Sequence, residues 1–201
     1  AVVKVLTGAL KQGQVAHAYL FAGARGTGKT SVARLLAKAL KTHAHDLYEI
    51  DAASNRGIDE MRELREAVRT LPFESKYKVY IIDEAHMLTK EAFNALLKTL
   101  EEPPAHVIFI LATTEAHKLP ETIISRCQQF TFRQPGLEEL RTVIIRTAKQ
   151  EGWALEPAAL NLVALLGDGS YRDALGVLQQ VFGATADKII TADLVASITG
   201  A

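Results

Sequence analysis

Residues 18–30 read AYLFAGARGTGKT. The first five are an apolar run of strand length, and the glycines that follow end it in a turn. From Lys29 to Leu40 the residues favour a helix. A strand, a glycine-rich turn and a helix in this order predict the opening unit of an α/β fold.

The turn matches the pattern G-x-x-x-x-G-K-[ST]. Glycines let backbone N–H groups wrap around a phosphate, and the helix that follows points its positive end at the same anion. We therefore predict a nucleotide-phosphate site in which Lys29 reaches the β- and γ-phosphates and Thr30 is a ligand of Mg²⁺. The alternative, an ordinary glycine-rich turn, has no need of the Lys-Thr pair. The predicted phosphate-binding residues are Gly23, Arg25, Gly26, Thr27, Gly28, Lys29 and Thr30.

A second motif, VYIIDE at residues 79–84, puts two carboxylates at the end of an apolar strand. Ligands of open α/β sheets bind at the carboxyl ends of the strands. Asp83 is predicted to hold Mg²⁺, directly or through a water, and Glu84 to orient and polarise the water that attacks the γ-phosphate. The alternative is a solvated acidic loop. His86 completes Asp-Glu-Ala-His, as in one class of helicases, but the chain has one phosphate-loop motif where such helicases pair two motor domains, so we assign His86 no catalytic role.

The rest of the chain alternates strands and helices and then becomes helical. The fold class predicted is α/β, a P-loop NTPase with a parallel five-stranded sheet followed by a small helical lid domain. The boundary is expected near residues 134–136, giving domains at 1–134 and 137–201. Strands are expected at 18–22, 47–50, 79–82, 107–111 and 129–132, and the late helices at 137–151, 157–166, 170–182 and 191–199.

Composition excludes several classes of protein. The 201 residues include 23 Lys and Arg against 23 Asp and Glu, and 48% are hydrophobic. No apolar run approaches the ~18 residues of a membrane helix. Cys127 is the one cysteine, so no internal disulfide forms, which suits a reducing cytoplasm. Zero net charge gives no overall attraction to nucleic acid, so any DNA contact must come from a local patch or an assembly.

The order of these motifs resembles the clamp-loader ATPases of the AAA+ class. LATT at residues 111–114, SRC at 125–127 and GSYRD at 169–173 follow the two nucleotide motifs. The segment HMLTKEAFNALLKTLEEPP at residues 86–104 is similar to the gamma/tau family of bacterial DNA polymerase III subunits. The resemblance covers essentially the whole chain. It implies an ATPase motor subunit that couples ATP binding and hydrolysis to loading a sliding clamp onto primed DNA, with ATP and Mg²⁺ as cofactors.

The resemblance also implies roles for further residues. Thr114, or less favourably Thr113, matches the polar residue that senses the γ-phosphate. Arg172 matches an arginine that reaches the phosphates of its own subunit, and pairing with Asp173 at the surface is the alternative. Arg126 matches an arginine finger that serves the ATP of a neighbouring subunit, and a structural surface arginine is the alternative. The implied partners are other clamp-loader subunits, the sliding clamp and primed DNA, in the cytoplasm and without a membrane.

DNA contacts follow from the same resemblance. Arg56, Arg62 and Lys98 match basic residues on the inner wall of the assembly. Arg62 stands among Glu60, Glu63 and Glu66, so a solvated helix face is the alternative.

The chain departs from the family in two places. It opens within a helix, AVVKVLTGALKQG, beyond the N-terminal segment that helps enclose adenine, so we expect a truncated N-terminus. Between residues 40 and 46, where members carry a four-cysteine zinc module, it has no cysteine. The module is either absent or omitted, and His43 and His45 alone rarely form a structural zinc site. Zinc is expected only if the full-length protein has the module.

Two other functions stay open at this point. One is a nucleotide-gated structural subunit that binds ATP without hydrolysing it, against which Lys29, Thr30 and Glu84 argue. The other is a different AAA+ machine, such as a branch-migration motor that closes into a homo-hexamer. The segment LLKTLEEPP at residues 96–104 favours the clamp loader.

Overall fold

The computed structural model describes residues 2–54, 58–185 and 188–201. The chain divides into two compact units, the first running to Gly23 and from Lys29 to Phe132, the second containing Ala24–Gly28 and Arg133–Ala201. The division therefore follows Phe132, and the tip of the glycine-rich turn groups with the second unit. None of the helices in the described ranges has the length and apolar character needed to cross a membrane.

Within the described residues, the first unit is built on a five-stranded sheet with the order β2-β3-β4-β1-β5, in which every neighbouring pair is parallel. Strand β4 lies between β1 and β3, and all its residues are buried. All five strands expected from the sequence are present. Their bounds are Ala18–Gly23 for β1, Leu47–Asp51 for β2, Lys78–Asp83 for β3, Val107–Thr113 for β4 and Gln128–Phe132 for β5.

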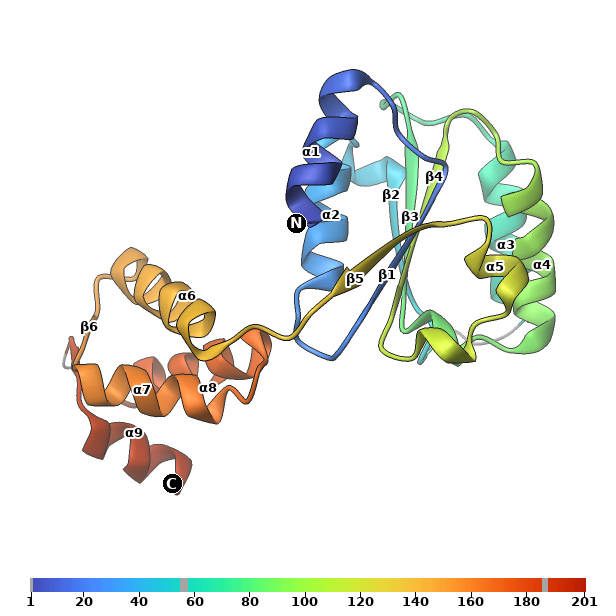
Figure 1. Ribbon diagram of the computed structural model, residues 1–201. Coiled ribbons are helices and arrows are strands. Elements are labelled where there is room, and N and C mark those ends of the chain that lie inside the picture. Colours follow the sequence, from blue (N-terminus) through green and yellow to red (C-terminus); the bar gives the residue numbers. More distant parts are fainter. Residues whose placement is uncertain (1, 55–57, 186–187) are drawn as a thin grey trace. The chain divides into compact units, whose positions relative to one another are not determined.

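Helices cover both faces of this sheet, as Figure 1 shows. Alternating strand residues point to opposite faces, so Tyr19 and Phe21 enter one core and Leu20 the other. One face carries α1 (Val2–Gln12) and α2 (Lys29–Ala39), and the other carries α3 (Ile58–Arg69), α4 (Lys90–Glu101) and α5 (Glu121–Ile124). Short 3₁₀ turns lie at Ala44–Asp46 (η1), Ala85–Met87 (η2) and Ala116–Lys118 (η3).

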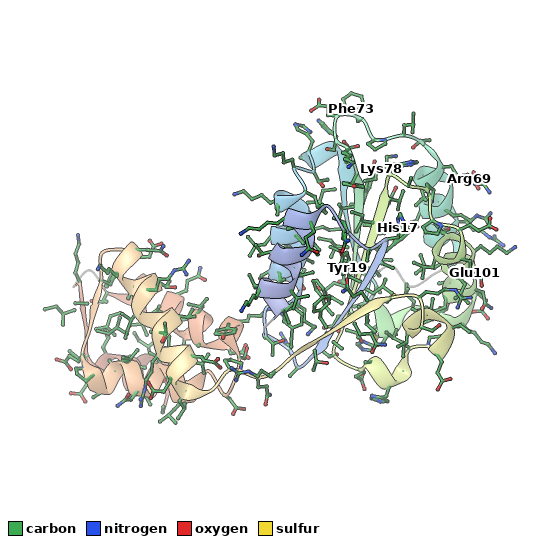
Figure 2. All side chains as sticks on the ribbon, turned by 45° about the horizontal axis from the view of Figure 1, so that its top comes forward. His17, Tyr19, Arg69, Phe73, Lys78 and Glu101 are labelled. Atoms are coloured by element: carbon green, nitrogen blue, oxygen red, sulfur yellow. The ribbon has the colours of Figure 1, made fainter. Side chains whose placement is uncertain are left out.

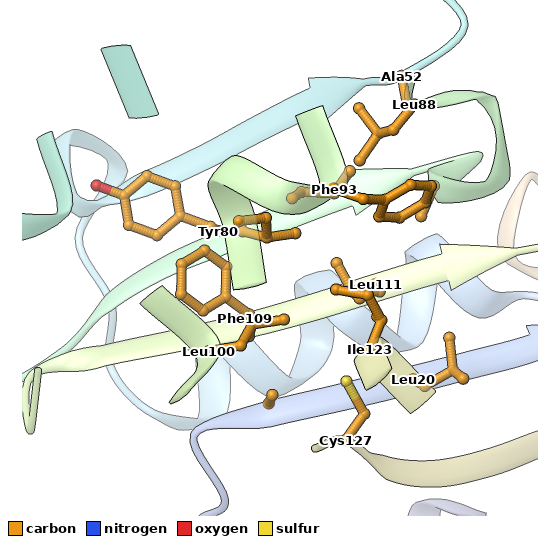
Figure 3. Packing of buried hydrophobic residues seen from close by; sticks show 14 of the residues in the cluster. Leu20, Ala52, Tyr80, Leu88, Phe93, Leu100, Phe109, Leu111, Ile123 and Cys127 are labelled. Carbon is orange, nitrogen blue, oxygen red and sulfur yellow. The ribbon is translucent and has the colours of Figure 1, made fainter. Parts of the chain in front are cut away.

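The core beneath α4 contains the single cysteine. Figure 3 shows Cys127 next to Ile123, in the same cluster as Leu20 and Leu111. Burial raises the pKa of the Cys127 thiol to about 11. The thiol is therefore protonated at neutral pH and packs as a small apolar group.

The ends of α4 follow local rules. The hydroxyl of Thr89 accepts the backbone N–H of Ala92 at 3.2 Å, which satisfies one of the free donors of the first turn. Pro103 and Pro104 stand just beyond Glu101, where a proline prevents the helix from continuing. These residues define where helix α4 begins, after β3, and where it ends, before β4.

The second unit packs its helices around a core of its own. The expectation that strands stop after residue 136 is wrong, because Ala154–Leu155 (β6) and Ile189–Ile190 (β7) form a small parallel pair. Strands of two residues are too short to show alternation, and only their pairing defines them. The helices are α6 (Leu137–Gln150), α7 (Pro157–Leu166), α8 (Tyr171–Ala184) and α9 (Ala192–Thr199).

Candidate active site

The exits of three strands meet at one edge of the sheet. Because β4 pairs with β1 on one side and with β3 on the other, its end lies between the phosphate-loop strand and the strand of the Asp-Glu motif. Thr113 is level with Ala22 of β1, and Leu111 with Ile82 of β3. Parallel strands have their carboxyl ends at the same edge, so residues far apart in sequence come together there.

The two predicted magnesium ligands are in direct contact. The hydroxyl of Thr30 donates to Asp83 Oδ2 at 2.6 Å, although 53 positions separate them in the chain. Thr30 lies in the first turn of α2 and Asp83 ends β3. A hydroxyl and a carboxylate oxygen are the ligand types that Mg²⁺ prefers, so this pair fits the cation.

Lys29 is folded back over the start of its own loop. Its side chain is buried, and Nζ donates to the carbonyl of Gly23 at 2.8 Å. A Cβ at Gly23 would lie 2.2 Å from the carbonyl oxygen of Phe132, so the neighbouring strand leaves room only for glycine. A buried ammonium needs hydrogen-bond partners, and this one sits at the strand exit where the loop begins.

Glu84 adopts a strained backbone and points toward β4. Its φ and ψ are 47° and 43°, the left-handed region that residues other than glycine seldom occupy. The N–H of Glu84 donates to Asp83 Oδ1 at 2.9 Å. The hydroxyl of Thr114 donates to Glu84 Oε2 at 3.1 Å. Of the two threonines considered, Thr114 is therefore the one that contacts the acid.

His86, for which we predicted no catalytic role, is a member of this cluster. Only 7% of its side chain is exposed, and its Nδ1 lies 3.0 Å from the hydroxyl of Thr113. Its Nε2 lies 3.2 Å from Glu115 Oε2. The signal available in the sequence was the spacing Asp-Glu-Ala-His, but the partners of the ring come from β4 and the residues after it, which the spacing does not reveal.

The remaining loop residues belong to the second unit. There the N–H of Tyr171 donates to the carbonyl of Gly26 at 2.9 Å, and the Thr27 hydroxyl donates to the Ala24 carbonyl at 2.9 Å. Gly26 has a φ of 71°, and a Cβ there would lie 1.9 Å from Ser170 Oγ. Arg25, Gly28 and Arg172 complete the predicted set; Arg172 follows the Ser170 cap of α8, and its side chain is exposed.

Arg126 contacts helices α4 and α5 of the first unit. Its guanidinium donates to Glu101 Oε1 of α4 at 2.9 Å and to the Thr122 carbonyl of α5 at 2.7 Å. It precedes β5, whose residue Gln128 pairs with Tyr19 near the amino end of β1. Arg126 thus stands at the sheet end away from the exit of β1.

The residues predicted to contact DNA or zinc lie outside this cluster. Arg62 and Lys98 are exposed, on α3 and α4 respectively, and Arg56 lies outside the described residues. His43 Nε2 is 3.1 Å from Glu74 Oε2, and its ring is 5.2 Å from that of His45. Among the described residues, no group of three or more His, Cys, Asp or Glu side chains could hold a metal. The zinc module stays a prediction.

Comparison with protein families finds one matching model. It is described as "DNA polymerase III, delta subunit", and it matches residues 1–50 and 41–136. The two stretches overlap at residues 41–50, on the connection where the sequence lacks the expected module.

Among curated proteins, the DNA polymerase III subunit tau of Bacillus subtilis is 46% identical over 221 residues, with 100% of this chain and 39% of that protein covered. Subunit tau of Escherichia coli is 43% identical over 220 residues, with 99% and 34% covered. This chain thus spans little more than a third of these relatives. Since it has 201 residues, the relatives also carry residues without a counterpart here.

Solved structures give the fold. A point mutant of Thermotoga maritima RuvB has a TM-score of 0.79 at 22% identity, covering 99% of this chain and 66% of that one. The T. maritima RuvB Holliday junction branch migration motor has a TM-score of 0.78 at 24% identity, covering 97% and 65%. The predicted α/β P-loop fold is confirmed, and at this identity the likeness extends to the fold alone.

Proposed function

Since the chain belongs to the DNA polymerase III family of clamp-loader subunits, we propose that it is an ATPase motor subunit of the replicative clamp loader. ATP binding would hold the assembled subunits in the shape that opens a ring-shaped sliding clamp, and hydrolysis would release the clamp onto primed DNA. The observation that carries the proposal is the contact between Thr30 and Asp83 at 2.6 Å, with Glu84 beside it.

The proposed chemistry assigns each group a step. Lys29, which donates to the Gly23 carbonyl, would contact the β- and γ-phosphates instead, and Thr30 and Asp83, which contact each other, would hold Mg²⁺. When bound, Mg²⁺ neutralises charge on the phosphate oxygens. The Glu84 carboxylate would orient and polarise the attacking water, and the Thr114 hydroxyl, which donates to it at 3.1 Å, would hold that carboxylate in place.

Two arginines are proposed to complete the site at different times. Arg172 reaches the phosphates of its own subunit. Arg126 acts on the ATP of a neighbour, which its place near the amino end of β5 supports: the strand from Gln128 to Phe132 separates it from the residue paired with Gly23, a span of ~13 Å. A guanidinium delivered in trans links hydrolysis to correct assembly.

The test is steady-state ATP hydrolysis by the full-length protein, reconstituted with the other loader subunits, with and without clamp and primed DNA. We expect stimulation by both. Nucleotide binding without turnover would instead indicate a structural subunit. Turnover by a homo-oligomer that responds to DNA but not to clamp would indicate another kind of AAA+ motor, with which this chain shares its fold.

A further inference from the structure

The ring of His86 connects the loop after β3 to the end of β4. It lies in η2, three residues beyond Asp83, and its side chain is almost fully buried. Its two nitrogens face different groups of the segment that leaves β4: Nδ1 faces the Thr113 hydroxyl at 3.0 Å, and Nε2 faces the Glu115 carboxylate at 3.2 Å. Both ring nitrogens of this buried side chain therefore have a polar neighbour.

Thr113 and Glu115 also contact each other. The N–H of Glu115 donates to the Thr113 hydroxyl oxygen at 3.0 Å. Glu115 also binds Lys118 Nζ at 2.9 Å, and that hydrogen bond holds the pKa of Glu115 below its usual value, so it remains an acceptor. The Nε2 of His86 thus faces a carboxylate that accepts hydrogen bonds.

These contacts form a closed circuit. The Glu115 N–H donates to the Thr113 hydroxyl, that hydroxyl lies 3.0 Å from Nδ1 of His86, and Nε2 of His86 lies 3.2 Å from Glu115 Oε2. The circuit fixes the backbone on both sides of Thr114. This arrangement directs the Thr114 hydroxyl toward Glu84 Oε2, to which it donates at 3.1 Å.

The His86 ring also lies close to the Glu84 carboxylate. Nδ1 of His86 lies 3.6 Å from Glu84 Oε2, the same oxygen that Thr114 contacts. Glu84 occupies a left-handed backbone conformation, which persists only where its surroundings impose it. The ring therefore limits where the Glu84 carboxylate can turn.

We propose that His86 is a positioning residue that holds Thr114 and Glu84 in the arrangement needed for ATP hydrolysis. The inference rests on the proposed function. His86 contacts neither the phosphate loop nor Asp83 in the described contacts, so it acts on turnover through Glu84 and Thr114 and leaves nucleotide binding to other residues.

The experiment compares His86→Ala, His86→Asn and His86→Gln in the full-length protein within the assembled loader. The amide of Asn superposes on Nδ1 and can still bond Thr113, whereas the amide of Gln superposes on Nε2 and reaches Glu115. We expect His86→Ala to lower kcat by about 10²-fold, the cost of a misplacement near 1 Å, with ATP affinity unchanged. At least one of the two amide variants should recover a substantial part of that loss.

His106→Ala is the matched control. Its ring is partly buried in the same unit, and Nε2 lies 3.1 Å from the carbonyls of Val68 and Thr70, far from any strand exit. We expect this variant to lower stability without changing kcat per folded molecule. Circular dichroism melting of each variant gives the folded fraction.

Three outcomes would overturn the inference: an unchanged kcat in His86→Ala, a loss that matches the unfolded fraction, or a loss that neither amide variant relieves. Measuring Glu84→Gln in the same series distinguishes a failure of the positioning role of His86 from a failure of the proposed function. If Glu84→Gln hydrolyses ATP at the parent rate, the proposed function itself fails. If only the His86 variants are normal, the positioning role alone fails.

Discussion

The two ends of the parallel sheet both carry charged side chains, but these side chains make different kinds of contact. At the amino ends, Asp46 precedes β2 and Lys78 opens β3 (Figure 2 labels Lys78). Asp46 accepts the backbone N–H groups of residues 73–75 at 2.6 to 2.9 Å. Lys78 Nζ donates to the Ala67 carbonyl at 3.0 Å and to the Thr70 hydroxyl at 2.6 Å. These charges are engaged in holding loops.

At the carboxyl ends, side chains contact side chains from other strand exits. Asp83 binds Thr30, and Glu84 binds Thr114 while its backbone is strained. A carboxylate has about four acceptor positions, and the Thr30 hydroxyl and Glu84 N–H use two of those on Asp83. Burial of a charge therefore does not identify a functional site by itself. The carboxyl ends differ in that side chains from separate strand exits contact one another.

The largest expected effect concerns Arg126, which lies at the amino end of β5. It tests whether a charged residue at the amino ends of the strands has a role in hydrolysis. Arg126→Ala should fold and bind ATP as an isolated chain like the parent, yet lower hydrolysis in the assembly by ~10³–10⁵-fold, because the phosphate on which we propose that it acts would belong to another subunit. Arg34→Ala, which breaks the exposed pair with Glu49, is the control. When the Arg126 variant stands beside a neighbour whose phosphate loop cannot bind ATP, hydrolysis by the assembly should fall no further than it does with the defective neighbour alone.

A loss of ATP affinity in isolated Arg126→Ala would contradict the role in trans. It would place the residue at its own nucleotide instead.

The next effect separates binding from chemistry at the carboxyl end. Glu84→Gln should keep ATP affinity and lower turnover by ~10²–10⁴-fold, because the carboxylate acts on the water only during the reaction. Lys29→Ala should abolish binding, because its ammonium contacts the ground-state phosphates. Filter binding of ATP and single-turnover hydrolysis measure the two losses. Equal ATP affinity in Lys29→Ala and the parent would refute the phosphate assignment.

The amino end should affect stability alone. Asp46→Ala leaves three backbone donors without their acceptor, so we expect the free energy of unfolding to fall by about 1–3 kcal/mol. Nucleotide affinity should not change. Urea denaturation of the parent and the variant measures the first quantity, and Glu49→Ala at an exposed ion pair is the control, with an expected loss below about 1 kcal/mol.

The same carboxylate predicts a dependence on pH. Burial by itself raises the pKa of Asp46, but hydrogen bonds from Glu74, Phe73 and Ser75 outweigh it and lower the pKa to about 2. The folded pKa is below the usual 3.8, so this contribution is complete above that pH and is lost as pH falls toward 2. Asp46→Asn should remove this part of the acid sensitivity, and an unchanged acid profile would rule it out.

The smallest effect concerns DNA. If Lys98 contacts the duplex backbone in the assembly, Lys98→Ala should reduce the slope of log K against log salt by ~0.9 and leave ATP affinity unchanged. Lys11→Ala, on the exposed end of α1, is the control. An unaltered slope together with unaltered DNA-stimulated hydrolysis would place Lys98 on the solvated surface.

Much of the first unit could be predicted because its signals are local. The strand at 18–22 and the turn after it follow from residues within a few positions of one another. The pair β6–β7 could not be predicted, since two-residue strands exist only through their pairing, and α7 and α8 separate the two in the chain. The role considered for Thr113 was open for a similar reason: either threonine ends the strand, and only the facing acid distinguishes them.

The sequence by itself determined the α/β class, the phosphate loop, the two acids after β3 and the family resemblance, because each depends on residue types at short, fixed spacings. The tertiary structure alone decided that β4 lies between β1 and β3, that Thr114 rather than Thr113 contacts Glu84, and that His86 joins them. The physical reason is that strand order is set by packing of the whole sheet between two helical layers. Side chains from different strand exits become neighbours only when that order is established.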